Sequence, residues 1–198
     1  MNMIQFLFSK DISTLSDNEL MHRIATKSDD RAFDQLYHRH GRRLMGFLLR
    51  QLRNDEERAA DLTQDTFMRV WTNRQKYKHD KEFTTWLFSI AYNLVKNEYR
   101  RTGYSEAYIH HAQYTQSREQ DDDVEIKIDD KALDEALQKE LDKLDAHGRM
   151  LFSLRYEEEM TTRQIAQIME IPEGTVKSRQ HTLIQTLKEK LKCYEHRR

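Results

Sequence analysis

Apolar residues recur every three or four positions through most of the first half of the chain, the spacing of one face of a helix. The expected helices run from Ser16, from about Arg31, from about Glu56 to Trp71, and from about Phe83 to Arg101. The first would begin with a capping box, in which the Ser16 and Glu19 side chains each accept a backbone N–H of the other. The residues expected to face inward are Leu20, Met21 and Ile24; Phe33, Leu36, Tyr37, Leu44, Phe47 and Leu48; Ala60, Phe67, Val70 and Trp71; and Trp86, Leu87, Ile90, Ala91 and Leu94.

The second half of the chain opens with a segment of weak periodicity. Residues 104–130 include the acidic run 121–123, and this predicts a partly disordered acidic linker. Two helices are expected after Lys131, and a helix-turn-helix from Thr161 to about Leu187. The apolar positions of the two helices before it are Leu133, Leu137, Leu141 and Leu144, and Met150, Leu151 and Leu154.

These elements predict an all-α protein of two small helical domains joined by an acidic linker. One proline and five glycines in 198 residues favour long helices. Charged residues make up 34% of the chain, which suits two thin cores better than one large core. The expected parts are an N-terminal tail over residues 1–14, a first domain over 15–103, the linker over 104–130 and a second domain over 131–198.

Charge is distributed unevenly along the chain, although its formal net value is only −1. Residues 31–101 carry 15 basic and 9 acidic side chains, residues 102–142 carry 4 and 12, and residues 143–198 carry 11 and 8. Two basic blocks around an acidic one indicate polyanion partners, although two solvated helical domains with ordinary surfaces would give the same pattern.

The chain offers no segment that predicts membrane insertion or a disulfide. The apolar opening, residues 1–8, is too short to span a bilayer and lacks a basic leader and a cleavage site. Cys193 is the only cysteine, so it can form neither an internal disulfide nor a cysteine-based zinc site. These features predict a protein of the reducing cytoplasm.

The helix-turn-helix would present the start of its second helix to DNA. Ala166 is small enough for close helix packing, and Pro172 suits the start of a helix after a tight turn. Side chains in the first turns of the second helix can reach base edges and phosphates in the major groove. A surface hairpin with scattered charges is the alternative. The exposed positions expected there are Thr175, Lys177, Ser178, Arg179 and His181.

Two sets of motifs follow one another along the chain. The first set is residues 61–67 (DLTQDTF), Trp71, residues 83–93 (FTTWLFSIAYN), Asn97 and Arg100-Arg101; the second is residues 151–156 (LFSLRY), 164–166 (QIA) and 174–179 (GTVKSR). They resemble regions 2.2 to 2.4 and region 4 of bacterial RNA polymerase sigma factors. The closest likeness is to the extracytoplasmic-function (ECF) group, which keeps only regions 2 and 4. The resemblance extends over nearly everything between Leu15 and Leu191.

The resemblance implies an alternative sigma factor that directs core RNA polymerase to specific promoters. Its implied partners are the β′ clamp helices and β flap of the polymerase, promoter DNA and a controlling anti-sigma factor. The residues implied in core binding are Asp61, Gln64, Asp65 and Met68. By spacing alone, the first three share one helix face, which an acidic solvated surface would also do.

The resemblance also implies which residues bind the promoter. The loop over residues 73–82 would capture an unstacked base of the −10 element, with Tyr77 either stacking on DNA or anchoring the core, and Trp86 in the core. The implied −10 residues are Lys76, Lys78, His79, Asn93, Lys96, Asn97, Arg100 and Arg101. The implied −35 residues are Arg163, Thr175, Lys177, Ser178, Arg179 and His181.

Several positions depart from the family pattern: Asn97, Asp145, Glu159, Gln164, Gln180 and His181. Glu159 stands where the family commonly has glycine in the turn before the helix-turn-helix. The run 157–159 places three glutamates near the expected DNA surface, which would weaken −35 binding or favour a protein contact. The acidic linker would thread toward the active-site cleft and RNA exit path of the polymerase, or would serve only solubility.

Two other classes of function compete with this interpretation. An autonomous transcriptional regulator could use the same helix-turn-helix, but it would not need the motifs at 61–67 and 83–93. A metal-dependent enzyme could use His110, His111 and nearby aspartates, but nothing sets these residues in a rigid geometry. No catalytic residue, metal or cofactor is therefore expected.

Overall fold

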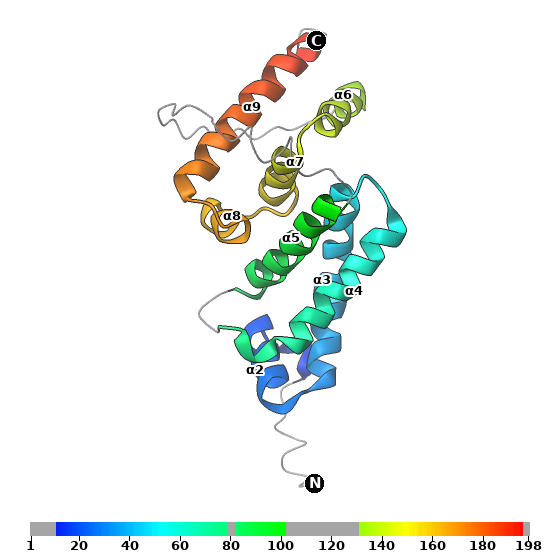
Figure 1. Ribbon diagram of the computed structural model, residues 1–198, viewed down its shortest axis with the longest axis vertical. Helices are drawn as coiled ribbons and strands as arrows, with labels where there is room; N and C mark the ends of the chain where they lie inside the picture. Colours follow the sequence, from blue (N-terminus) through cyan, green and yellow to red (C-terminus); the bar gives the residue numbers. More distant parts are fainter. Residues whose placement is uncertain (1–10, 79–81, 102–130, 196–198) are drawn as a thin grey trace. The chain divides into compact units, whose positions relative to one another are not determined.

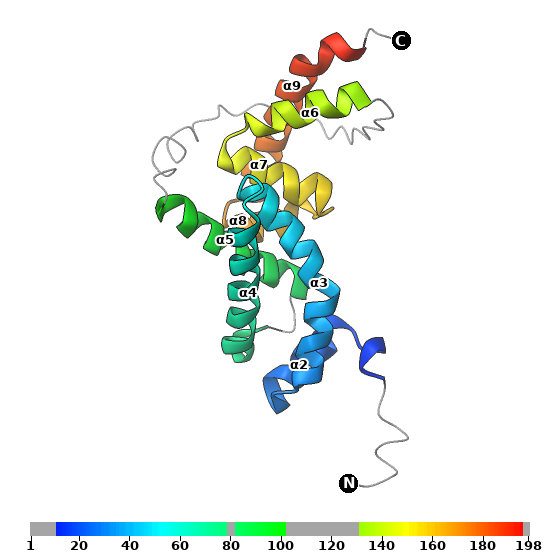
Figure 2. The ribbon, with the colours of Figure 1, turned by 90° about the vertical axis from the view of Figure 1, so that its right-hand side faces the viewer.

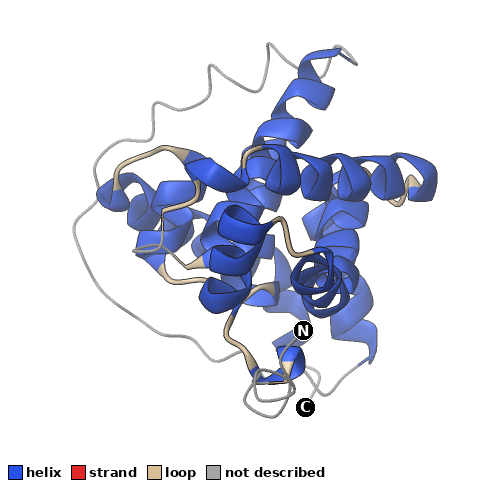
Figure 3. Cartoon of the chain, turned by 90° about the horizontal axis from the view of Figure 1, so that it is seen from below, coloured by secondary structure: helices blue, strands red, loops and turns tan. Residues whose placement is uncertain are grey.

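The computed structural model describes residues 11–78, 82–101 and 131–195, and these are helical with no strand among them (Figure 3). The chain divides into two compact units, Met1–Glu98 and Tyr99–Arg198. The expectation of an all-α protein with two small helical domains is confirmed. The expected linker over 104–130 lies outside the described residues. Within the described part, no helix is both long enough and apolar enough to cross a membrane.

The first unit is built from η1 (Ile12–Thr14), α2 (Asp17–Lys27), α3 (Asp30–Gln51), α4 (Glu56–Thr72), η2 (Arg74–Lys76) and α5 (Phe83–Arg101), whose last turn crosses the division between the units. Helices α3 and α4 lie side by side, and α2 packs against α3 (Figures 1 and 2). The tight turn between α3 and α4 places Arg53 and Asn54 at φ of 55° and 63°.

Side-chain caps explain where these helices begin. The capping box of α2 is present in full: the Glu19 backbone N–H donates to the Ser16 hydroxyl over 3.2 Å, and the Ser16 N–H donates to the Glu19 carboxylate over 2.7 Å. The Asp29 and Asp55 carboxylates cap α3 and α4 by accepting the backbone N–H of Ala32 and of Arg58. Each cap satisfies a donor that the first turn of a helix would otherwise leave unpaired.

The core of the first unit follows the predicted apolar face, with six corrections. Leu36, Phe47 and Leu87 are fully buried, as expected. Tyr37 is 46% exposed, because its ring leans on Phe67 at the edge of the core, with the centroids 4.8 Å apart. Five other positions expected inside are half-buried: Phe33, Ala60 (its neighbour Ala59 is buried instead), Trp71, Trp86 and Ile90.

The second unit contains α6 (Lys131–Asp142), α7 (Ala146–Phe152), η3 (Ser153–Glu157), α8 (Thr162–Met169) and α9 (Glu173–Glu195). Here η3 is a single π-helical turn that continues α7. Helices α6, α7 and α8 all contact α9, so this unit is assembled around α9 (Figure 1). Its core includes Met150, Leu154, Ile165, Ile168, Val176 and Leu187.

Candidate polymerase and nucleic-acid interfaces

One side of α4 gathers the four residues predicted to bind the polymerase core. Asp61, Gln64, Asp65 and Met68 are all exposed, and the exposed fraction of Met68 is 58%. The residues between them, including Leu62, Thr66 and Phe67, are buried. These four residues therefore form one exposed surface of α4, which is polar at the first three positions and apolar at Met68.

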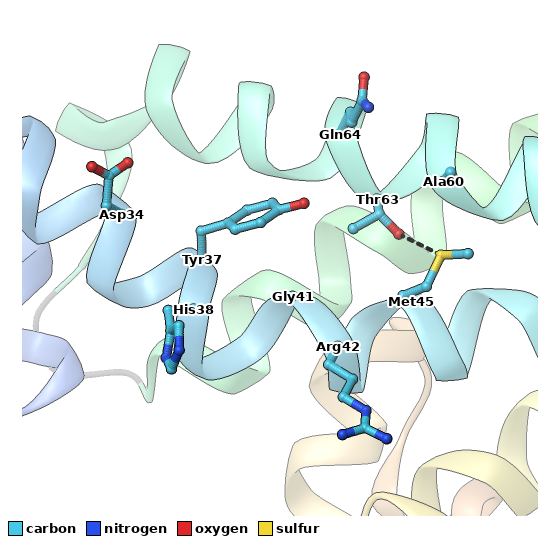
Figure 4. A pocket seen from close by; sticks show the side chains of 9 residues that line it. All are labelled: Asp34, Tyr37, His38, Gly41, Arg42, Met45, Ala60, Thr63 and Gln64. Atoms are coloured by element: carbon cyan, nitrogen blue, oxygen red, sulfur yellow. Dashed lines mark hydrogen bonds between the residues drawn. The ribbon is translucent and has the colours of Figure 1, made fainter.

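A groove of about 590 Å³ lies between α3 and α4 beside this surface (Figure 4). Its lining residues are Asp34, Tyr37, His38, Gly41, Arg42, Met45, Ala60, Thr63 and Gln64. Figure 4 shows the Tyr37 ring lying between the two helices, and Thr63 donating its hydroxyl to the Met45 sulfur over 3.5 Å. Gln64 belongs to both the groove and the exposed side of α4, so the groove extends the predicted core-binding surface.

Tyr37 is a surface residue that the sequence pattern did not indicate. Tyrosine fits an apolar stripe, so helical periodicity predicted a core position here. The available signal is Gly41, one helical turn later, where a Cβ atom would meet the Tyr37 ring at 3.5 Å. A tyrosine one turn before a glycine can lie flat on its own helix and keep one edge in water.

Arg58 joins the predicted core-binding surface to helix α5. Its Nη2 atom lies 2.6 Å from Oε2 of Glu98, a buried carboxylate on α5, and its Nη1 atom lies 3.3 Å from Oδ2 of Asp61. The hydrogen bond with Glu98 raises the pKa of the Arg58 guanidinium above its ordinary value, although burial opposes this. The pair fixes how α4 and α5 face one another.

The opposite side of α5 carries the predicted −10 residues. Asn97, Arg100 and Arg101 are exposed, while Asn93 and Lys96 are half-buried. The Asn93 side chain donates to the Ser89 carbonyl over 3.1 Å, so its carbonyl oxygen points away from that bond and can accept another. The predicted −10 residues of α5 are thus wholly or partly exposed, whereas Glu98 on the same helix is buried.

In the loop before α5, Tyr77 is a core anchor. It is 6% exposed, and its ring centroid lies 5.1 Å from Trp86 and 6.4 Å from Phe83. Of the two roles left open for Tyr77, stacking on DNA is therefore not available to it in this conformation. Lys76 and Lys78 are exposed, and the predicted contact at His79 lies outside the described residues.

Helices α8 and α9 form the predicted helix-turn-helix. Thr161 and Gln164 complete a capping box at the start of α8, with bonds of 2.8 and 3.3 Å. The turn passes through Glu170 at φ 57°, and the Pro172 carbonyl accepts the backbone N–H of Thr175 over 2.9 Å. This bond begins the first turn of α9, and the Ile171 backbone N–H, which donates to the Ala166 carbonyl over 3.1 Å, ties the turn to α8.

The first turns of α9 present the predicted −35 residues. Lys177 and His181 are exposed, while Thr175, Ser178 and Arg179 are half-buried. The Ser178 hydroxyl donates to the Thr175 carbonyl over 3.1 Å, which leaves its lone pairs outward. Arg163 on α8 is exposed as well.

The glutamates before α8 differ in their surroundings. Glu157 and Glu159 are exposed, whereas Glu158 is 4% exposed, so only two of the three expected charges lie at the surface. Glu159 has φ 54°, the left-handed region that favours glycine. The departure from glycine noted in the sequence thus has a conformational cost at this turn.

Comparisons with known proteins decide which family these surfaces belong to. Sigma-70 region 2 matches residues 36–104, and sigma-70 region 4 matches residues 141–189. The ECF RNA polymerase sigma factor SigL of Mycobacterium tuberculosis is 30% identical over 156 residues, which cover 77% of this chain and 85% of SigL. This chain belongs to the ECF group of the sigma-70 family. The RNA polymerase sigma-H factor of Pseudomonas aeruginosa is 28% identical over 82% of this chain and 87% of its own length.

Solved structures of similar proteins support the same assignment. CnrH, solved in complex with the cytosolic domain of CnrY, is 25% identical with a TM-score of 0.61, over 90% of this chain and 96% of that chain. The sigma factor RpoE of Bartonella quintana, solved with the anti-sigma factor NepR, is 25% identical with a TM-score of 0.59, over 81% and 96%.

The predicted family and fold are confirmed by these comparisons. As an alternative ECF sigma factor, the protein acts in transcription initiation, with core RNA polymerase and promoter DNA as its partners. The individual residues assigned to core, −10 and −35 binding remain predictions. Among the described residues no group of His, Cys, Asp and Glu could hold a metal, and His110 and His111 lie outside them.

Proposed function

We propose that this sigma factor binds the β′ clamp helices of core polymerase through the exposed side of α4 and the adjoining groove. The single observation that carries this is the arrangement of Asp61, Gln64, Asp65 and Met68, which are exposed together on α4 while the residues between them are buried. Carboxylates and an amide can pair with basic and polar partner residues, while Met68 and Tyr37 offer apolar contact. Most of the binding energy is expected from these two apolar anchors.

We propose that α9 reads the −35 element as duplex and that α5 with its preceding loop opens the −10 element. The −35 residues are Arg163, Thr175, Lys177, Ser178, Arg179 and His181. Arg179 would pair with a guanine edge, and the hydroxyls would bond to phosphate or base. The −10 residues are Lys76, Lys78, His79, Asn93, Lys96, Asn97, Arg100 and Arg101. Extruding a base costs a few kcal/mol, which a basic helix face next to the displaced strand offsets.

The proposed organisation has a tail over residues 1–14, a core- and −10-binding domain over 15–103, an acidic linker over 104–130 and a −35-binding domain over 131–198. The second domain would also contact the β flap. The protein works in the cytoplasm, where core polymerase is found, and catalyses no covalent reaction of its own.

We also propose control by an anti-sigma factor. The similar sigma factor RpoE was solved with the anti-sigma factor NepR, and the similar protein CnrH was solved with the cytosolic domain of CnrY. A partner that covers Tyr37 and Met68 would exclude the clamp helices, because both would need the same apolar anchors.

Transcription in vitro tests the proposal. Purified core polymerase, with and without this protein, transcribes fragments of the source bacterium's genome, and the transcripts are sequenced. New start sites that need the protein, preceded by shared −10 and −35 sequences, are expected. The variant D61N/D65N should need a higher concentration for half-maximal transcription, whereas E189Q, which removes an exposed charge in the second unit, should not. A protein that neither binds core nor creates new start sites would not be the initiation factor proposed.

A further inference from the structure

Helix α2 is attached to the segment after α4 at both of its own ends. The Tyr77 hydroxyl donates a short hydrogen bond to Oδ1 of Asn18 in the first turn of α2. At the other end, Nη2 of Arg74 donates to the hydroxyl of Ser28, the C-cap of α2, over 3.2 Å. Asn18 and Ser28 are ten residues apart, which is about 15 Å along a helix. The described part of the loop is therefore fixed to α2 at two well-separated points.

Tyr77 connects α2 to the start of α5 as well. Its ring packs on Trp86 and Phe83, with centroids 5.1 and 6.4 Å away, while its hydroxyl reaches Asn18. The apolar ring is held by packing and its polar end by one directed bond. This combination fixes the rotation of the side chain and, with it, the backbone between the exposed Lys76 and Lys78.

A second path from α2 to α5 runs through the neighbouring residue, Asp17. Its carboxylate accepts bonds from Nε2 of His40, over 2.6 Å, and from Nη1 of Arg39, over 2.8 Å. The His40 ring in turn lies against Phe83, with the centroids 5.2 Å apart. Asp17 and Asn18, both in the first turn of α2, are therefore linked to the aromatic cluster of Tyr77, Phe83 and Trp86. Asp17 is linked through His40, and Asn18 through Tyr77.

We propose that Asn18 is a positioning residue for promoter opening. Through Tyr77 it holds the segment between η2 and Lys78 in one conformation, so that Lys76 and Lys78 face the displaced −10 strand before DNA arrives. Capture of an extruded base is more favourable when the segment from η2 to Lys78 is already ordered, because the ordering entropy is not lost at that moment. This inference rests on the −10 role proposed above for the first domain.

The alternative is that the bond only stabilises the fold. The two roles predict different effects of losing the bond on core binding and promoter opening. A structural bond would weaken core binding and promoter opening together, because both surfaces belong to the same unit. A positioning bond would lower promoter opening while leaving core affinity unchanged, because the Asn18 bond acts on the loop through Tyr77 and not on α4.

The experiment uses full-length protein with core polymerase on the strongest promoter found by transcript sequencing. A fluorescent adenine analogue, 2-aminopurine, in the −10 non-template strand reports opening. Y77F, which keeps the ring, and N18A should each lower the opening equilibrium about fivefold, the value of one net hydrogen bond. The double variant should fall no further than either single variant. N18D, which keeps an acceptor oxygen, should open the promoter as the wild type does.

The matched control is T26A on the same helix. The Thr26 hydroxyl donates to the carbonyl of His22 within α2 itself, so its loss should leave opening unchanged. Opening by N18A and Y77F at the wild-type level would overturn the inference, and so would a loss of core affinity in step with opening. Failure of the wild-type protein itself to open any promoter would overturn the proposed function, and this inference with it.

Discussion

Replacing Glu98 by glutamine should weaken the first unit measurably, because Arg58 makes its shortest ion pair there. The pair joins α4 to α5, and its Nη2–Oε2 distance is 2.6 Å. At an effective dielectric constant of about 20, the attraction between two charges at this distance is on the order of 6 kcal/mol. The loss of hydration of both groups cancels most of it. A charge-assisted hydrogen bond contributes about 1.5–3 kcal/mol net.

Exposure sets the final value and supplies the control. The Glu98 side chain is 8% exposed and that of Arg58 is 31% exposed, so water partly screens the pair. E98Q should therefore lower the free energy of unfolding by about 1–2 kcal/mol. D61N removes the other partner of Arg58, which lies 3.3 Å away and is 57% exposed, and should cost less than about 0.5 kcal/mol.

Urea unfolding, followed by tryptophan fluorescence, measures these differences in the free energy of unfolding of the first unit. Both tryptophans, Trp71 and Trp86, lie in the first unit, so their signal reports its unfolding alone. A double-mutant cycle of R58M and E98Q isolates the pair, with an expected coupling of about 1–2 kcal/mol. A coupling below about 0.3 kcal/mol, or a cost for D61N equal to that for E98Q, would show that the Arg58–Glu98 pair does not stabilise the first unit as proposed.

Three further predictions concern other parts of the molecule. E159G should raise the stability of the second unit by about 0.5–1 kcal/mol, measured by the midpoint of its thermal unfolding, because glycine accepts the φ of 54° without strain; an unchanged or lower midpoint would count against a strained turn. Burial alone would raise the pKa of Asp17, but the hydrogen bonds and charges of His40 and Arg39 lower it. A lowered pKa means that the ionised carboxylate stabilises the fold above about pH 4 and that this stability is lost as pH falls through the lowered value. D17N should thus be less stable than wild type at pH 7, with the difference shrinking below about pH 4; a constant difference in urea unfolding across pH would contradict the assignment. R179A should lose about 1–3 kcal/mol of preference for the correct −35 sequence over a substituted one, and equal discrimination by wild type and variant in a binding competition would remove Arg179 from base reading.

The fold could be predicted from the sequence wherever local sequence rules and tertiary packing favour the same structure. The capping box at Ser16 could be predicted because it depends only on residues three apart. The buried faces of α3 and α4 followed from helical periodicity. The edges of those faces did not: Tyr37 and Ala60 lie where a helix turns from core to surface, and periodicity does not mark that border.

The candidate site was predictable one helix at a time, but its connections were not. Periodicity placed Asp61, Gln64 and Asp65 on one side of α4. It could not show that Arg58 reaches Glu98, because these residues are 40 positions apart and meet only when α4 packs against α5. The bond between Asn18 and Tyr77 spans 59 positions and was hidden for the same reason.

The most direct test of the central claim is the amount of promoter-specific transcript made by core polymerase with increasing wild-type protein or the Y37A/M68A variant. These two exposed side chains adjoin the predicted core-binding carboxylates and pack little of the core. The variant should need at least about tenfold more protein for half-maximal transcription, since each of two interface anchors contributes about 1 kcal/mol or more. Equal transcription by both proteins at every concentration would contradict the claim that α4 and its groove form the polymerase-binding surface.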